Sequence, residues 1–159
     1  MQLKKNCPLL VLRFTQFGHY DFVKEHNCLI CDNGFTWMLK KGRNIPLKSL
    51  ETVLNSGGGM ILKAPKKAGG IYYYAHFSAC ANGVPQDNYN YPRYYAEITD
   101  EYVDNPLDGT WIKLDYIHEL SDDIVEHLYL SSNDNKVVDV IGKTRTSVMY
   151  AYLDENFKV

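Results

Sequence analysis

Aromatic and basic residues gather between residues 33 and 77, in a pattern that suits contact with a nucleic acid. Trp37 lies on an expected strand over residues 35–39, and three consecutive tyrosines lie on another over residues 71–79. A flat aromatic ring stacks on a nucleobase, and a lysine or arginine contacts the phosphate backbone. The candidate phosphate-binding residues are Lys40, Lys41, Arg43, Lys66 and Lys67. The stretch therefore predicts a base-binding wall beside a basic surface.

The alternation of side chains along a strand divides the tyrosines between two faces. Tyr72 and Tyr74 share one face with His76, whereas Tyr73 lies on the other. One face must enter the core, and the other is available to line a groove. The candidate base-binding residues are Trp37, Tyr72, Tyr73, Tyr74 and His76. An equally open interpretation makes Trp37 a core residue, since large aromatic side chains dominate cores.

Motifs for catalysis or for metal binding are incomplete. His76-Phe77-Ser78 resembles half of a two-histidine phosphodiesterase site, but the sequence holds no second His-x-Ser/Thr. Cys28 and Cys31 form a CxxC, but a structural zinc needs four ligands and no second matched pair is present. The alternative is two half-buried thiols. We therefore expect no catalytic residue, no metal and no cofactor, and we consider an enzyme the less favoured possibility.

The net charge of −2 hides an uneven distribution. Residues 1–67 hold eleven basic and four acidic side chains, whereas residues 68–159 hold six basic and fifteen acidic ones. This asymmetry predicts one basic face and an acidic body. The length of 159 residues predicts a single domain over residues 1–159. No apolar run approaches the ~18 residues of a membrane span, so we expect no membrane association and a cytoplasmic location.

Short strands separated by frequent turns predict an α+β fold. Asp21 is expected to cap a helix through about His26 or beyond, and Pro46 to begin a second. Residues 120–127 suit a third helix, and residues 81–92 are expected to form a loop. The candidate strands cover residues 8–15, 35–39, 60–64, 71–79, 93–99, 110–118, 128–131, 137–141 and 146–153. We expect roughly six or seven strands in the sheet, with two or three short flanking helices.

The order of these features resembles the EVE domain, a branch of the PUA-like superfamily that also includes YTH and ASCH domains. The residues that carry the resemblance are Thr36-Trp37 with Lys40, Lys41 and Arg43, then Gly58–Leu62, Lys67–Tyr72, Tyr94–Ile98, Asn105-Pro106-Leu107 and Thr144–Phe157. The resemblance implies a PUA-like twisted mixed β-barrel. It also implies recognition of a modified base through an aromatic cage.

Three functions follow from these interpretations. The leading hypothesis is a noncatalytic reader of DNA or RNA, in which Trp37 stacks on a base. The second is a protein-interaction module, an inhibitor or adaptor, that binds a protein partner through its tyrosine-rich surface. Leu12-Arg13-Phe14, where the family has its opening tryptophan, favours this second hypothesis. The third is a nuclease of the ASCH type that uses His76 with a lysine or tyrosine as an acid–base pair.

Overall fold

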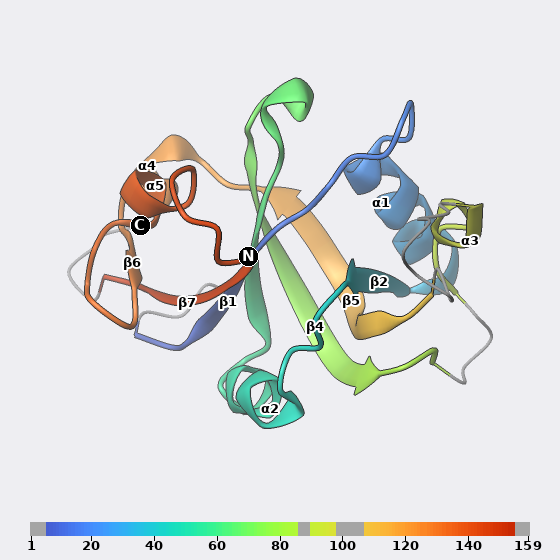
Figure 1. Cartoon of the computed structure of the whole chain (residues 1–159), viewed down its shortest axis with the longest axis horizontal. Helices are drawn as coiled ribbons and strands as arrows, with labels where there is room; N and C mark the ends of the chain where they lie inside the picture. The colour runs from blue at the N-terminus through green and yellow to red at the C-terminus, as the bar shows by residue number, and fades with distance from the viewer. Residues whose placement is uncertain (1–5, 86–89, 98–106, 155–159) are drawn as a thin grey trace.

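One mixed sheet of seven strands organises the chain in the computed structural model, which describes residues 6–85, 90–97 and 107–154 (Figure 1). The strand order is β2-β5-β4-β3-β1-β7-β6. The strands are β1 (Leu9–Arg13), β2 (Thr36–Lys41), β3 (Gly59–Lys63), β4 (Tyr72–Asn82), β5 (Gly109–Glu119), β6 (Leu128–Leu130) and β7 (Val148–Leu153). The helices are α1 (Phe22–Asn33), α2 (Leu47–Asn55), α3 (Tyr94–Glu97), α4 (Asp122–Val125), α5 (Val137–Val140) and the 3₁₀ turn η1 (Lys66–Ala68).

The strands at the centre of the sheet are buried on both faces. β1 pairs in parallel with β3 and antiparallel with β7. Leu10 and Leu12 of β1 enter one core, whereas Leu9 and Val11 enter a second core on the opposite face. Burial on both faces explains why β1 reads as a continuous apolar run rather than as an alternation of polar and apolar residues.

Helices cover the two faces of this central region. α1 and α2 close the first core through buried residues Phe22, Leu50 and Val53. The second core is closed by α4 and α5 with β6 and β7, which Figure 1 shows together on one side of the molecule. The three tyrosines of β4 are divided as expected, because Tyr72 and Tyr74 pack against the second core and Tyr73 packs against the first.

A third, aromatic cluster covers the outer face of β2 and β5. Its buried members are Trp37, Leu39, Tyr94, Tyr95 and Trp111. The segment before α3 also holds the outer edge of β2, because the Trp37 backbone N–H donates to the Asn90 carbonyl at 2.7 Å. A covered edge prevents another strand from adding there.

The helix boundaries follow from local sequence. Asp21 caps α1, since its Oδ1 accepts from the Lys24 N–H at 3.1 Å. Gly34 ends that helix with a φ of 84°, the left-handed conformation that glycine adopts without a Cβ clash. Pro46 directly precedes α2, as its fixed φ favours. No helix in the described ranges combines the length and the apolarity that crossing a membrane requires.

Two expected strands are helices instead. Residues 94–97 form α3, where the adjacent Tyr94 and Tyr95 are buried in the same cluster. A strand would send these neighbours to opposite faces. Residues 137–140 form α5, because Val137 and Ile141 are both buried in the second core and a spacing of four residues unites them on a helix. The loop expected over residues 81–92 begins later, since Ala81 and Asn82 extend β4, and residues 86–89 and 98–99 lie outside the described part.

The α+β class and the seven strands agree with the sequence-based expectation, but the described part of the chain holds five α-helices in place of the expected two or three. Within the described residues the sheet is not closed into a barrel, because β2 and β6 stand at its two ends and are not paired with each other.

Candidate functional site

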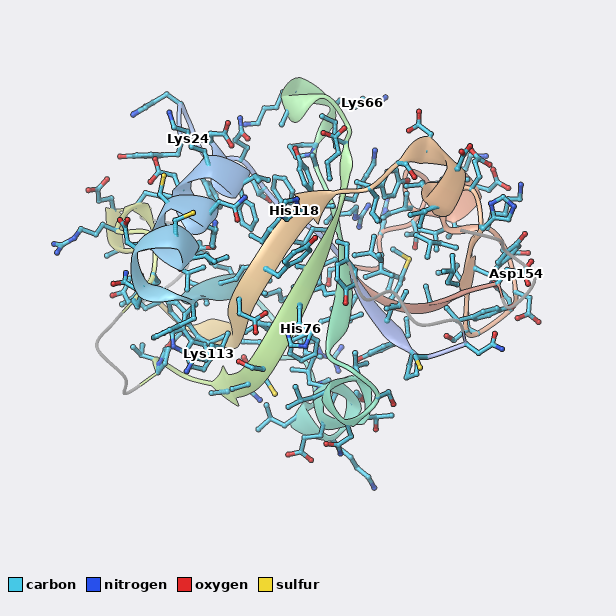
Figure 2. All side chains as sticks on the ribbon, turned by 180° about the vertical axis from the view of Figure 1, so that it is seen from behind. Lys24, Lys66, His76, Lys113, His118 and Asp154 are labelled. Carbon is cyan, nitrogen blue, oxygen red and sulfur yellow. The ribbon has the colours of Figure 1, made fainter. Side chains whose placement is uncertain are left out.

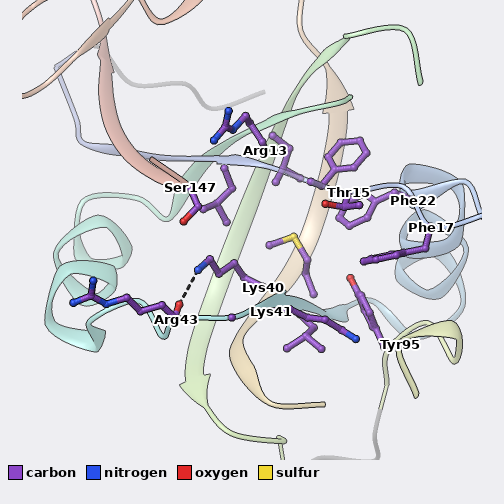
Figure 3. A pocket seen from close by; sticks show the side chains of 15 residues that line it. Arg13, Thr15, Phe17, Phe22, Lys40, Lys41, Arg43, Tyr95 and Ser147 are labelled. Carbon is purple, nitrogen blue, oxygen red and sulfur yellow. Dashed lines mark hydrogen bonds between the residues drawn. The ribbon is translucent and has the colours of Figure 1, made fainter. Parts of the chain in front are cut away.

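A hollow of about 380 Å³ opens between β1 and β2, two strands that are not neighbours in the sheet (Figure 3). We call it the basic hollow. Its polar lining comprises Arg13, Lys40, Lys41, Arg43, Tyr95, Thr15 and Ser147. Its apolar lining includes Phe14, Phe17, Phe22, Met38 and Leu62. The volume lies at the lower end of the range of small-molecule sites, and none of the described lining residues is acidic.

Arg13 fixes the side of the basic hollow that β7 approaches. Its Nη1 donates to the carbonyls of Ile141 at 3.1 Å and Thr144 at 2.9 Å. Its Nη2 donates to the Thr146 carbonyl at 2.9 Å. These three bonds hold residues 141–146 against β1, and they thereby place Ser147 at the hollow. Arg13 therefore has a structural task in addition to its positive charge.

Lys40 and Arg43 concentrate positive charge at the end of β2. The Lys40 Nζ donates to the Arg43 carbonyl at 2.7 Å. Burial, and secondly the charge of Arg43, lowers the pKa of Lys40. Lys41 lies on the next position, with its Nζ 5.9 Å from the centre of the Phe17 ring. A bound anion would compensate the burial and the repulsion that destabilise the charge on Lys40.

Aromatic rings form the opposite side of the basic hollow. Phe14 and Phe22 are stacked, with ring centres 4.1 Å apart and planes at 11°. Phe17 is half-buried, and Figure 3 shows it with Tyr95 across the hollow from Arg43 and Ser147. The Lys41 Nζ lies on this same side, so a planar ligand ring placed between the two sides meets aromatic carbon and Lys41 on one side and Lys40 on the other.

Tyr95 is held by a fully buried histidine of α1. The Nε2 of His26 lies 2.7 Å from the Tyr95 hydroxyl, and its Nδ1 lies 2.7 Å from the Phe22 carbonyl. Burial lowers the pKa of His26 to about 4, so the ring is neutral at neutral pH. A carbonyl only accepts, so Nδ1 carries the proton and Nε2 accepts one from Tyr95.

The five predicted phosphate-binding residues fall into two groups. Lys40, Lys41 and Arg43 come together at the basic hollow. Lys66 and Lys67 lie on η1, at the tip of the β3–β4 hairpin that projects from the body of the molecule (Figure 1). They do not line the hollow.

The predicted base-binding residues lie outside the basic hollow. Trp37 is 5% exposed and packs in the aromatic cluster, which is the core position weighed as the alternative. Tyr74 is 3% exposed. Tyr72 lies under the Lys63 Nζ, which is 4.4 Å from its ring centre, and Tyr73 contacts Phe14 with ring centres 6.3 Å apart. Base binding by these four side chains stays a prediction.

His76 has an acidic partner rather than the expected lysine or tyrosine. Its Nδ1 lies 2.7 Å from Oδ1 of Asp115, and both side chains are partly exposed. Figure 2 shows His76, His118 and Lys113 along the β4–β5 face. Cys28 and Cys31 are exposed on α1, and no group of three metal-binding side chains assembles among the described residues.

Sequence reasoning did not include Arg13, Phe17, Tyr95 or Ser147 in the site. Arg13 carried one usable signal, a charged residue at the end of an otherwise apolar strand. The other three lie in segments far apart in the chain, and only the fold brings them to one hollow. Comparison of the chain with protein-family models, curated proteins and solved structures finds no match.

Proposed function

We propose that the protein binds nucleic acid by taking one unstacked base into the basic hollow. The single observation that carries this proposal is the opposition of the half-buried Phe17 to Lys40 across a hollow of about 380 Å³. Stacking on an aromatic side chain contributes about 1–3 kcal/mol per base. Lysine and arginine supply the phosphate contacts that such a ligand requires.

The resemblance to EVE domains supports the same proposal. In this interpretation the sheet is a curled, open relative of the PUA-like barrel, because β1 and β2 face a common hollow without pairing. The ligand-binding residues differ from those that the resemblance implies. The half-buried Phe17 takes the place proposed for Trp37, and the cations of the β2–α2 connection keep the role proposed for them.

The proposal is tested by the salt dependence of binding to single-stranded DNA and RNA oligonucleotides. Fluorescence anisotropy of labelled oligonucleotides at several salt concentrations gives the slope of log K against log salt. The double substitution Lys40→Gln with Lys41→Gln should reduce that slope by about 1.4, since each lost phosphate contact on a single strand contributes about 0.7.

A matched control removes the same charge outside the basic hollow, with Lys24→Gln and Lys48→Gln, two exposed lysines that are not among the predicted phosphate-binding residues. This variant should bind with nearly the wild-type slope. Equal effects of the two double variants would assign the binding to general charge instead of the hollow. An absence of saturable binding across the DNA and RNA panel would reject the proposed function.

Burial of Trp37 favours a second candidate, the protein-interaction module. A tryptophan that is 5% exposed is not offered to a flat ligand. In this second candidate the partly exposed Tyr72, Tyr73 and Tyr116 would contact a protein partner, since tyrosine is enriched in interface hot spots. Saturable, salt-dependent oligonucleotide binding that depends on Lys40 would favour the reader over this candidate.

A further inference from the structure

We propose that the basic hollow binds the phosphorylated end of a nucleic-acid strand, with the terminal phosphate monoester held by Lys40 and Ser147. This inference rests on the proposed function and adds the part of the strand that the hollow takes. A terminal monoester carries a charge of about −1.5 to −2 at pH 7, whereas an internal phosphodiester carries a single negative charge.

One side of the basic hollow combines an ammonium with a hydroxyl. Figure 3 shows Lys40 and Ser147 on this side, whereas the side chain of Arg43 is directed away from the hollow. Ser147 occupies this place because three hydrogen bonds from Arg13 hold the segment just before it against β1. An ammonium from β2 and a hydroxyl from the residue that precedes β7 are thereby brought to one site.

These two groups have hydrogen-bond donors to offer to a ligand. The Lys40 ammonium has three N–H groups, and one of them donates to the Arg43 carbonyl at 2.7 Å. Two N–H groups of Lys40 and the hydroxyl of Ser147 are then available, and a phosphate monoester has three acceptor oxygens to receive them. None of the described lining residues is acidic, so no carboxylate in that part of the chain competes with the phosphate.

The charge of Lys40 favours a doubly charged ligand. Burial, and secondly the charge of Arg43, lowers the pKa of Lys40, so the protonated ammonium is disfavoured in the empty hollow. A bound anion compensates both effects, and at the same distance a dianion attracts the ammonium about twice as strongly as a monoanion does. Lys40 should therefore discriminate a terminal monoester from an internal phosphodiester.

The inner boundary of the basic hollow also favours a strand end. Leu12, Met38 and Leu62 line the hollow and are buried members of the first core. The hollow therefore ends at the core, and a strand can enter it but cannot run through it. A volume of about 380 Å³ suits one nucleotide rather than several. A terminal nucleotide would place its base against Phe17 and its phosphate at Lys40.

Three oligonucleotides of one sequence test the inference. One carries a 5′ phosphate, one carries a 3′ phosphate, and one has hydroxyl groups at both ends, while the fluorescent label sits at an internal base. We expect the wild-type protein to bind at least one phosphorylated form about tenfold more tightly than the hydroxyl form, and the preferred form gives the direction of the bound strand. The preference should shrink from pH 7.5 to pH 5.5, because a phosphate monoester loses its second charge near a pKa of about 6.

Two substitutions at the site should remove the preference. Lys40→Gln removes the ammonium and should bring the affinities for the phosphorylated and hydroxyl forms within about twofold of each other, whereas Lys48→Gln, at an exposed lysine outside the hollow, should keep the wild-type preference. Ser147→Glu adds a carboxylate that repels the terminal phosphate, and Ser132→Glu is its control at an exposed serine outside the hollow. Ser147 is exposed, so this change leaves the core packing intact. A preference for a phosphorylated end that survives Lys40→Gln or Ser147→Glu would overturn the inference.

The outcomes separate the inference from the function on which it rests. Equal binding of the phosphorylated and hydroxyl oligonucleotides by the wild-type protein, with salt-dependent affinity retained, would overturn the inference about the strand end and leave the proposed function standing. No binding of any of the three oligonucleotides would overturn both.

Discussion

Acidification should destabilise the protein through His26 before most other groups respond. The side chain is fully buried between Phe22 and Tyr95, and burial lowers its pKa from 6.5 to about 4. In the unfolded chain the imidazole regains its ordinary pKa. Between pH 6.5 and pH 4 the unfolded state therefore binds more protons than the folded state, and the free energy of unfolding decreases as the pH falls.

The size of the effect follows from the two pKa values. Each pH unit between them corresponds to about 1.4 kcal/mol. For a pKa of 6.5 in the unfolded chain and about 4 in the folded protein, the loss is about 2 kcal/mol from pH 7 to pH 5. It reaches about 3 kcal/mol at pH 4. The contribution is fully present above pH 6.5, and it is lost as the pH falls through the folded-state value.

Urea unfolding followed by tryptophan fluorescence at half-unit steps from pH 7.5 to pH 4.5 measures this loss. His26→Gln removes the titrating group, so the free energy of unfolding of this variant should change far less between pH 7.5 and pH 4.5. At pH 7 the variant should be less stable than the wild type. The exposed His118 gives a matched control, because His118→Gln should keep the wild-type pH dependence. Equal pH dependence of wild type and His26→Gln would refute the assignment.

Two further changes test how the basic hollow is held together. Arg13→Ala removes three hydrogen bonds to the segment before β7, so it should lower the free energy of unfolding in urea by about 2 kcal/mol and speed amide hydrogen exchange at residues 142–147. As a control, Arg145→Ala at an exposed side chain should change the free energy of unfolding by less than about 0.5 kcal/mol. Gly109→Ala should cost about 3 kcal/mol in thermal unfolding, because a Cβ there meets the Lys40 carbonyl and the φ is +148°. Gly142→Ala, where a Cβ meets nothing within 4 Å, should leave the melting temperature nearly unchanged, and similar losses for the two glycine variants would contradict the reasoning.

The elements that sequence reasoning predicted correctly are those whose signals are local. Asp21 caps a helix and Pro46 precedes one because the responsible contacts lie within four residues. The apolar run of β1 and the tyrosine run of β4 predicted strands because their side chains enter cores on both faces. For these segments local propensity and long-range packing agree.

The errors occur where long-range packing decides. Valine and isoleucine at 137–141 favour a strand by propensity, but the second core buries Val137 and Ile141 from one side. Residues 94–97 form a helix because the adjacent Tyr94 and Tyr95 are both buried in the aromatic cluster, which a strand would not allow. The basic hollow was predicted only in its β2–α2 part, because its remaining sides come from segments up to 134 positions apart, from Arg13 to Ser147. No spacing within one segment encodes such a juxtaposition.

The position of β1 between β3 and β7 has a consequence for the order in which the sheet is completed. During synthesis β1 emerges before the other described strands, and β3 supplies its parallel neighbour after about fifty residues. Its other edge pairs with β7, which begins at Val148. Until that strand leaves the ribosome, half of the backbone groups on this central strand and one side of Leu9 and Val11 remain without their final partners. Among the described strands, the first to be synthesised is thus paired on its second edge by the last, and a ribosome that stalls before residue 148 exposes the centre of the sheet rather than its margin.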